Sequence, residues 1–108
     1  MKSAIPSMFA VASLLFAGPA FSSEEMMELL KENNCLGCHR IDAKRVGPTY
    51  KKIAQKYRGD PNAAAILEKK IVTGGNGVWG TMPMPEFSNR IPPEDMKAMI
   101  AFILSLPD

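Results

Sequence analysis

Residues 35–39 read Cys-Leu-Gly-Cys-His, and the rest of the chain is best understood from this stretch. It holds both cysteines and the only histidine among the 108 residues, in the C-x-x-C-H spacing that marks covalent attachment of c-type haem. Two thiols at this spacing can each add to one vinyl group of a haem, which leaves the next residue beneath the ring. Because imidazole is a common axial ligand of haem iron, we expect His39 to be the proximal ligand.

Three other interpretations of the cysteine pair are open. A thioredoxin-like redox dithiol normally follows a strand in a βαβ pattern, whereas a charged amphipathic helical stretch precedes Cys35. A tetrahedral zinc site needs four ligands, and Cys35, Cys38 and His39 are the only Cys and His residues available. A structural disulfide is the third alternative.

The first 22 residues are expected to be a cleaved export signal. Lys2 supplies a positive charge, an apolar run follows over residues 8–16, and small residues lead up to a cut that we place after Ser22, with Ala20 as the alternative. An uncleaved membrane anchor is the competing interpretation. The apolar run is shorter than the ~20 residues that a spanning helix needs, so no stable membrane anchor is expected after cleavage.

Residues 23–108 are expected to form one domain, too small to bury more than a modest core by itself. A large apolar prosthetic group would complete such a core. Export predicts a periplasmic location, an oxidising compartment where the two cysteines could pair, but their C-x-x-C-H context assigns both to haem.

Charge is unevenly distributed along this domain. Residues 23–34 carry a net charge of −3, residues 40–70 a net +6 and residues 86–108 a net −2. Most of these charges are expected on solvated helix faces. A basic middle near the cofactor would also steer docking onto acidic redox partners, an effect that weakens with salt. The net charge of +2 for the whole chain argues against nucleic-acid binding.

Apolar residues recur at helical spacing in four segments, and no segment shows a strand pattern. The segments run from residue 24 to about 33, from 48 or 49 to 58, from 61 to about 73, and from 93 to about 106. Ser22 or Ser23 can cap the first, Asp60-Pro61 opens the third, and Pro107 ends the last. The side chains expected to face inward are Met26, Met27, Leu29, Leu30, Tyr50, Ile53, Ala54, Tyr57, Ala63, Ile66, Leu67, Ile71, Met96, Met99, Ile100, Ile103 and Leu104.

Residues 74–85 read Gly-Gly-Asn-Gly-Val-Trp-Gly-Thr-Met-Pro-Met-Pro and form the longest expected loop. The glycines do not make a phosphate cradle, because the G-K-[ST] ending and a preceding strand are missing. They instead let the backbone pass close to a flat ring, while the prolines stiffen the segment that carries Met82 and Met84. No helical face claims these two methionines, so they differ from the core methionines Met26, Met27, Met96 and Met99.

Taken together, the residues from 23 to 108 resemble the class I cytochromes c, and specifically the short bacterial monohaem carriers. The resemblance covers the whole expected mature chain: an N-terminal helix, C-x-x-C-H, Gly-Pro, Gly-Val-Trp-Gly, Pro-Met-Pro and a closing amphipathic helix. It implies an all-α fold of about four helices wrapped around one covalently bound haem c, with the first and last helices crossing.

The resemblance also implies roles for individual residues. Met84 is the expected second axial ligand, with Met82 as the runner-up. Pro48 matches the proline whose carbonyl orients the proximal imidazole. Trp79 and Lys70 match residues that contact the haem propionates; core packing and a solvated helix charge, respectively, are the alternatives.

Two positions depart from the family's pattern. Asn34 stands where a glycine usually lets the terminal helices approach, which puts the closeness of that crossing in doubt. Phe87 stands where these carriers often have a side chain that hydrogen-bonds the methionine sulfur, so its presence should alter how the ligand is held.

These features predict a soluble periplasmic single-electron carrier that shuttles electrons between respiratory donors and terminal reductases or oxidases. We expect it to be a monomer and not an enzyme. Two axial ligands would leave no site for a substrate, and electrons would pass to redox partner proteins docking at the haem edge. A peroxidase would need an open iron site and distal acid–base groups, and no second histidine exists. The alternatives are a haem c subunit of a larger oxidoreductase and a haem-free thiol oxidoreductase.

Overall fold

The computed structural model describes residues 3–8, 10 and 21–108, and this part of the chain is helical without a strand. Its elements in order are α1 (Ser23–Glu32), the 3-10 turn η1 (Cys35–Gly37), α2 (Tyr50–Tyr57), α3 (Ala63–Thr73) and α4 (Pro93–Leu104). The all-α prediction with about four helices is confirmed. None of the helices in the described ranges has the length and apolar character needed to span a bilayer.

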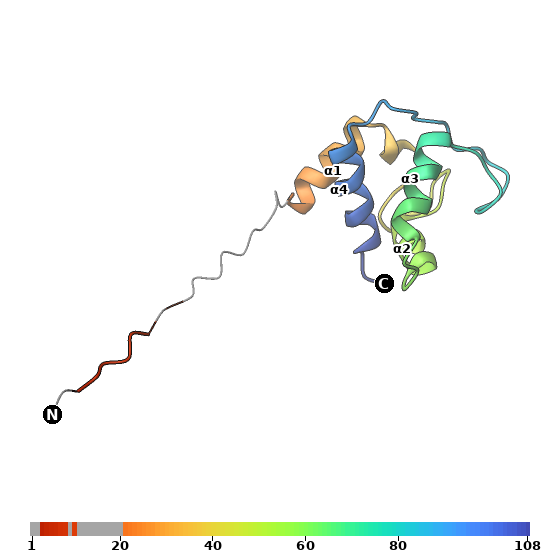
Figure 1. The fold of residues 1–108 in the computed structure, drawn as a ribbon. Coiled ribbons are helices and arrows are strands. Elements are labelled where there is room, and N and C mark those ends of the chain that lie inside the picture. Colours follow the sequence, from red (N-terminus) through yellow and green to blue (C-terminus); the bar gives the residue numbers. More distant parts are fainter. Residues whose placement is uncertain (1–2, 9, 11–20) are drawn as a thin grey trace.

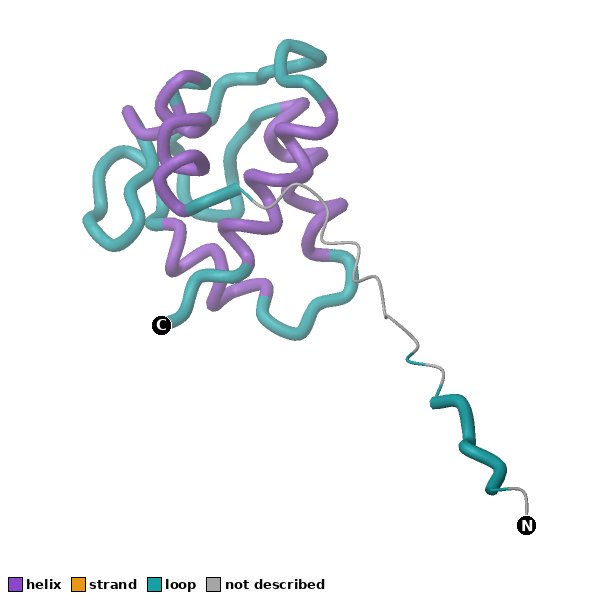
Figure 2. Tube along the Cα trace, turned by 90° about the vertical axis from the view of Figure 1, so that its left-hand side faces the viewer, coloured by secondary structure: helices purple, strands orange, loops and turns teal. Residues whose placement is uncertain are grey.

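Helix α4 is the central helix of the fold, because it packs against α1, α2 and α3 (Figure 1). Long loops connect the helices and run along the outside of the helical domain (Figure 2). Leu30 of α1 and Met99 of α4 are almost completely buried where the terminal helices meet, at 1% and 2% exposure. The rest of the core cluster comprises Tyr50, Ile53, Leu67, Ile91, Met96, Ile100 and Ile103.

Helix α3 begins two residues later than the sequence predicts. Asp60 accepts a hydrogen bond on Oδ1 from the Asn62 main-chain N–H at 2.8 Å, so Asp60 and Pro61 form a turn before the helix. The expectation that Ile66 faces inward is also wrong, since Ile66 is 39% exposed. Ala63 and Leu67, four residues apart on the helix, supply the buried face instead.

Asn34 takes the conformation that a glycine would provide at this position. Its backbone is left-handed, with φ 62° and ψ 17°, and its N–H donates to the Lys31 carbonyl at 3.0 Å. Asparagine tolerates this region better than most residues. The turn therefore forms without glycine, and α1 still packs against α4.

The expected leader lies mostly outside the described residues, but the residue just before the proposed cut is well placed. Ser22 is the N-cap of α1, and its Oγ accepts a hydrogen bond from the Glu25 main-chain N–H at 3.1 Å. Glu24 and Glu25 lie in the first turn, where negative charge favours the helix. Cleavage after Ser22 would remove this cap, whereas cleavage after Ala20 would retain it.

For the alternative cleavage after Ala20, which gives a mature chain that begins at Phe21, we expect Ser22→Ala to lower the free energy of unfolding of the haem-loaded protein by about 1 kcal/mol. The loss arises because the Glu25 main-chain N–H would lose its hydrogen-bond acceptor, Ser22 Oγ. Denaturant unfolding followed by far-ultraviolet circular dichroism measures it. Ser22→Asp is the matched control, because aspartate also caps, and equal stability of the two variants would contradict the cap's contribution.

Candidate functional site

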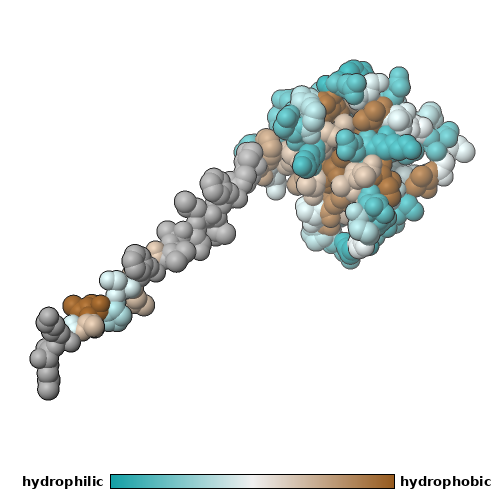
Figure 3. Space-filling view, in the orientation of Figure 1, coloured by the Kyte–Doolittle hydropathy of each residue, from teal (hydrophilic) through white to brown (hydrophobic). Residues whose placement is uncertain are grey.

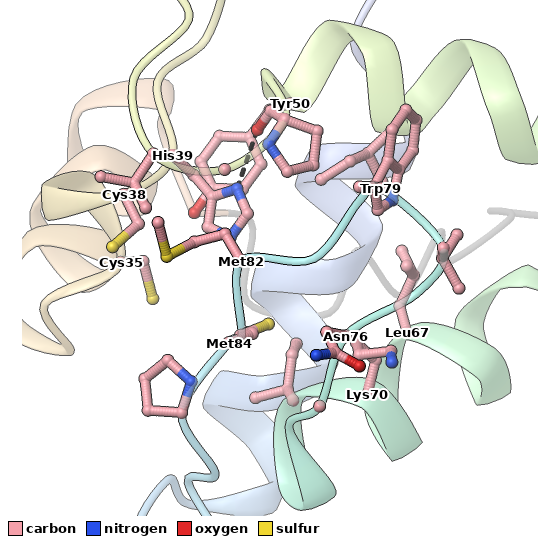
Figure 4. Close-up of a pocket in the computed structure, with 18 of the residues that line it drawn as sticks. Cys35, Cys38, His39, Tyr50, Leu67, Lys70, Asn76, Trp79, Met82 and Met84 are labelled. Atoms are coloured by element: carbon pink, nitrogen blue, oxygen red, sulfur yellow. Dashed lines mark hydrogen bonds between the residues drawn. The ribbon is translucent and has the colours of Figure 1, made fainter.

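An apolar cavity lies between the helices and the loop of residues 74–85, and all the residues that the sequence proposes as haem attachment points, ligands or contacts line it (Figure 4). Apolar side chains also reach the surface in the middle of one face of the helical domain, between hydrophilic ones (Figure 3). The apolar residues that line the cavity include Leu30, Val46, Ile53, Leu67, Ile71, Val78, Phe87, Ile91, Met99 and Ile103. The chain thus builds a hollow that its own side chains do not fill.

Cys35, Cys38 and His39 share one wall of this cavity (Figure 4). The turn η1 brings them together, because the N–H groups of Cys38 and His39 both donate to the Cys35 carbonyl, at 3.2 and 2.9 Å. Both cysteines are free and half-buried, so the disulfide alternative is not what the structure contains. Burial raises the pKa of the Cys35 thiol, which keeps it protonated near neutral pH.

The loop after His39 fixes the orientation and the tautomer of its ring. His39 Nδ1 lies 2.8 Å from the Pro48 carbonyl oxygen. Because a carbonyl can only accept, Nδ1 carries the proton and donates, which leaves Nε2 with a free lone pair. This is the arrangement of a metal-ligating histidine with an outer partner that holds it.

Gly47 lets the backbone pass directly against this imidazole. A Cβ at Gly47 would lie 2.7 Å from His39 Cε1 and 3.0 Å from Nδ1. The Gly47 N–H donates to the Cys38 carbonyl at 2.8 Å, which ties the loop to the cysteine turn. There is no room for a side chain at this position, so a glycine is needed for the loop to pack against the His39 ring.

Tyr50 is a site residue that the sequence indicated only as a core position. It is 3% exposed, and its ring stacks on His39 with centroids 5.3 Å apart and an interplanar angle of 21°. Burial raises the pKa of its phenol well above the usual range, and the nearby Cys35 thiol acts in the same direction. Its place at the start of α2, two residues after Pro48, was the available signal.

Met84, in the loop of residues 74–85, lines the cavity, and its backbone is fixed by pairing with Gly75. Gly75 and Met84 exchange two main-chain hydrogen bonds, at 3.0 and 2.8 Å. Gly74 has φ 64°, and a Cβ there would lie 2.5 Å from the Met84 carbonyl oxygen. Met84 is half-buried on this fixed backbone, whereas Met82, which also lines the cavity, is 65% exposed.

Trp79 and Lys70 both line the cavity. Trp79 is 45% exposed, so its ring is not buried among the protein's own core side chains. Lys70 is half-buried near the end of α3, and in Figure 4 it lies beside Asn76, away from the cysteine wall. An indole N–H and an ammonium group are the donors that carboxylates of a bound group would need.

Phe87 also lines the cavity and is half-buried, three residues after Met84. Its N–H donates to the Ile71 carbonyl at 3.0 Å, which anchors the chain to the end of α3. The Arg90 guanidinium lies 5.4 Å from the centre of its ring. The position thus presents an aromatic ring and no hydrogen-bond donor from the side chain.

The residues fit a haem and do not fit a metal ion alone. No group of three or more His, Cys, Asp and Glu side chains gathers around a common point in the described part of the chain, which argues against the zinc alternative. Two thiols at C-x-x-C spacing, an imidazole with a free Nε2 and an apolar hollow are what covalent haem attachment requires. Fold and site together define a small helical protein that carries a c-type haem.

Comparisons with known proteins agree with this class, because the Cytochrome c family profile matches residues 24–107. The chain belongs to the cytochrome c family and is a class I monohaem member. It is 43% identical over 106 residues to cytochrome c-552 of Nitrosomonas europaea, covering 98% of this chain and 99% of the relative. It is 37% identical over 102 residues to cytochrome c-551 of Pseudomonas aeruginosa, covering 94% of each chain.

The crystal structure of wild-type Nitrosomonas europaea cytochrome c552 has the same fold. It superimposes with a TM-score of 0.69 at 43% identity, over 75% of this chain and 99% of that one. Family membership implies one covalently bound haem c and a role in electron transport.

Proposed function

We propose that this protein is a periplasmic single-electron carrier whose haem c is attached through Cys35 and Cys38 and ligated by His39 and Met84. Met82 is the runner-up for the second ligand. The observation that carries the proposal is that an oriented imidazole and a backbone-fixed thioether line the same cavity. Occupation of both axial positions leaves no place for a substrate, which favours electron transfer over catalysis.

Haem iron supplies a one-electron ferric–ferrous couple when bound, and the residues of this chain hold and tune it. The Pro48 carbonyl keeps the proton on His39 Nδ1, so that Nε2 would be free to bind the iron. The apolar lining excludes water, and a thioether ligand favours the ferrous state. We propose that Trp79 and Lys70 donate to the haem propionates at the open side.

Docking of redox partner proteins is proposed at this same open side. Val46, Val78, Trp79 and Met82 line the cavity and are at least 45% exposed, so they form an apolar rim. Helix α2 reaches this rim where Lys56 contacts Trp79, and it exposes Lys52 and Lys56 with no acidic residue in its sequence. An acidic partner would be steered there by charge and held by the apolar centre, in an encounter that weakens as salt rises.

The proposal also assigns the two parts of the chain. Residues 1–22 are the leader that directs export, and residues 23–108 are the mature cytochrome c domain. A monomer is proposed as the working form. A haem c subunit of a larger oxidoreductase is the alternative, and co-purification with a stable partner together with a larger hydrodynamic size would support it.

An absorption spectrum combined with intact mass tests the carrier proposal in one preparation. After expression with the c-type maturation machinery, we expect a mass equal to residues 23–108 plus one haem. The ferric spectrum should be low-spin, with the weak red-edge band of sulfur-to-iron ligation, and peroxide should not react rapidly. A high-spin spectrum with an exchangeable sixth site would overturn the carrier assignment, and a colourless product with two titratable thiols would favour the thiol oxidoreductase.

A further inference from the structure

Lys56 lies between two aromatic rings that come from different parts of the fold. Its Nζ is 5.8 Å from the ring centre of Tyr57 and 5.6 Å from that of Trp79. Tyr57 is its neighbour on α2, whereas Trp79 belongs to the loop that carries Met84. Ammonium groups within about 6 Å of a ring centre are attracted by the ring face. Lys56 therefore links α2 to this loop.

The loop behaves as one small hairpin from residue 75 to residue 84. Its base is closed by the Gly75–Met84 pair, and its tip by the Gly77 N–H donating to the Gly80 carbonyl at 2.8 Å. Asn76 donates from Nδ2 to the Thr81 carbonyl at 3.2 Å between these two points. Because the hairpin is bonded along its length, displacement of the tip would be transmitted to Met84 at the base.

The protein's own side chains bury the tip only in part. Val78 and Trp79 line the cavity and are 50% and 45% exposed, so neither is packed into the protein core. An attractive contact to a rigid helix is what would keep such a segment in place. The contact available in the structure is the Trp79 ring on the Lys56 ammonium.

We propose that Lys56 is a positioning residue that latches the 75–84 hairpin closed over the cavity and thereby keeps Met84 at the iron. The inference rests on the proposed role of Met84 as an axial ligand. Lys56 is exposed, so its ordinary interpretation is a solvated charge that helps steer partners. The latch differs from that interpretation because it depends on the side chain's contact with Trp79 and not on the net charge of α2.

The expected effect follows from the fraction of molecules in which the hairpin is open. An external ligand such as imidazole can reach ferric iron only when Met84 has left, so its apparent affinity is proportional to the open fraction. Removing an exposed cation–π contact should raise that fraction about fivefold, which corresponds to about 1 kcal/mol.

Three variants of the ferric holoprotein separate the latch from a general charge effect. Lys56→Gln should bind imidazole about fivefold more tightly in a spectrophotometric titration. Lys56→Arg should restore the affinity of the unmodified protein, since a guanidinium also stacks on aromatic rings. Lys52→Gln, which removes an equal charge from an exposed position of the same helix, should leave it unchanged. Equal behaviour of Lys56→Gln and Lys52→Gln, or no restoration by arginine, would overturn the latch.

Hydrogen exchange of the Trp79 indole N–H, measured by NMR on the ferrous holoprotein, reads the latch without relying on Met84. Lys56→Gln should speed this exchange about fivefold, and Lys52→Gln should not. Unchanged exchange would refute the latch even if Met84 is the ligand. Faster exchange in a protein whose ferric spectrum lacks the sulfur-to-iron band would support the latch as a clamp on Trp79 and refute the proposed ligation instead.

Discussion

Met84→Ala is expected to leave the haem attached while opening the sixth coordination position. The thioether bonds and His39 are untouched by this change. Met82 also lines the cavity, but it is 65% exposed, whereas the Met84 backbone is paired with Gly75. The ferric protein should lose the sulfur-to-iron band, become high-spin and bind imidazole without competition. Because the thioether ligand favours ferrous iron, the reduction potential should fall by on the order of 0.2 V, a fraction of the ~0.8 V range that axial ligands control. Optical titration and potentiometry measure both effects.

Met82→Ala is the matched control for this prediction. Met82 is 65% exposed, so its truncation removes little buried surface, and the spectrum and potential should change little. If Met82→Ala opened the iron site and Met84→Ala did not, the two assignments would be exchanged. That result would mean that haem binding draws the more exposed thioether inward, past the backbone-paired one.

Much of the site was predictable because its chemistry is concentrated in short stretches of sequence. The C-x-x-C-H stretch brings thiols and imidazole together through local backbone geometry, and Pro48 follows closely enough to reach His39. The helices were predictable because apolar spacing reports the face that is buried. The helix ends were harder to predict. The Asp60–Pro61 turn depends on a side-chain hydrogen bond, and the exposure of Ile66 depends on which face of α3 packs against α4.

Contacts between distant segments were the part that the sequence could not provide. Lys56 looks like any exposed helix lysine until the hairpin brings Trp79 to it. Tyr50 looks like a core residue until the loop folds His39 onto its ring. Each of these contacts joins two segments that the packing of the helices brings together. The spacing of apolar residues along the chain does not predict such a contact. Gly47 lies in the same loop as Pro48 and belongs to the Gly-Pro pair, but its close approach to the imidazole ring becomes visible only in the structure.

Gly47→Ala is the second substitution with a large expected effect, and it acts through His39. A Cβ at this position would lie 2.7 Å from His39 Cε1, closer than a Cβ atom normally approaches another carbon, and 3.0 Å from Nδ1, which is also a tight contact. The imidazole cannot simply swing away, because Pro48 holds Nδ1 at 2.8 Å and iron would hold the opposite nitrogen. The loop must move instead, which strains the hydrogen bond from Gly47 to Cys38. We expect a loss of about 1–3 kcal/mol in the free energy of unfolding of the holoprotein, the usual range for overpacking.

Gly37→Ala is the matched control for this prediction. Gly37 lies inside the C-x-x-C-H stretch, only ten residues earlier, yet a Cβ there meets nothing within 4 Å. The same methyl group should therefore change the stability by less than about 0.5 kcal/mol, as for most surface substitutions. Denaturant unfolding of the two holoproteins measures the difference, and the haem absorption bands report whether His39 is displaced. Equal stability of the two variants, with unchanged bands in both, would show that the loop yields without cost and that Gly47 does not constrain the proximal ligand.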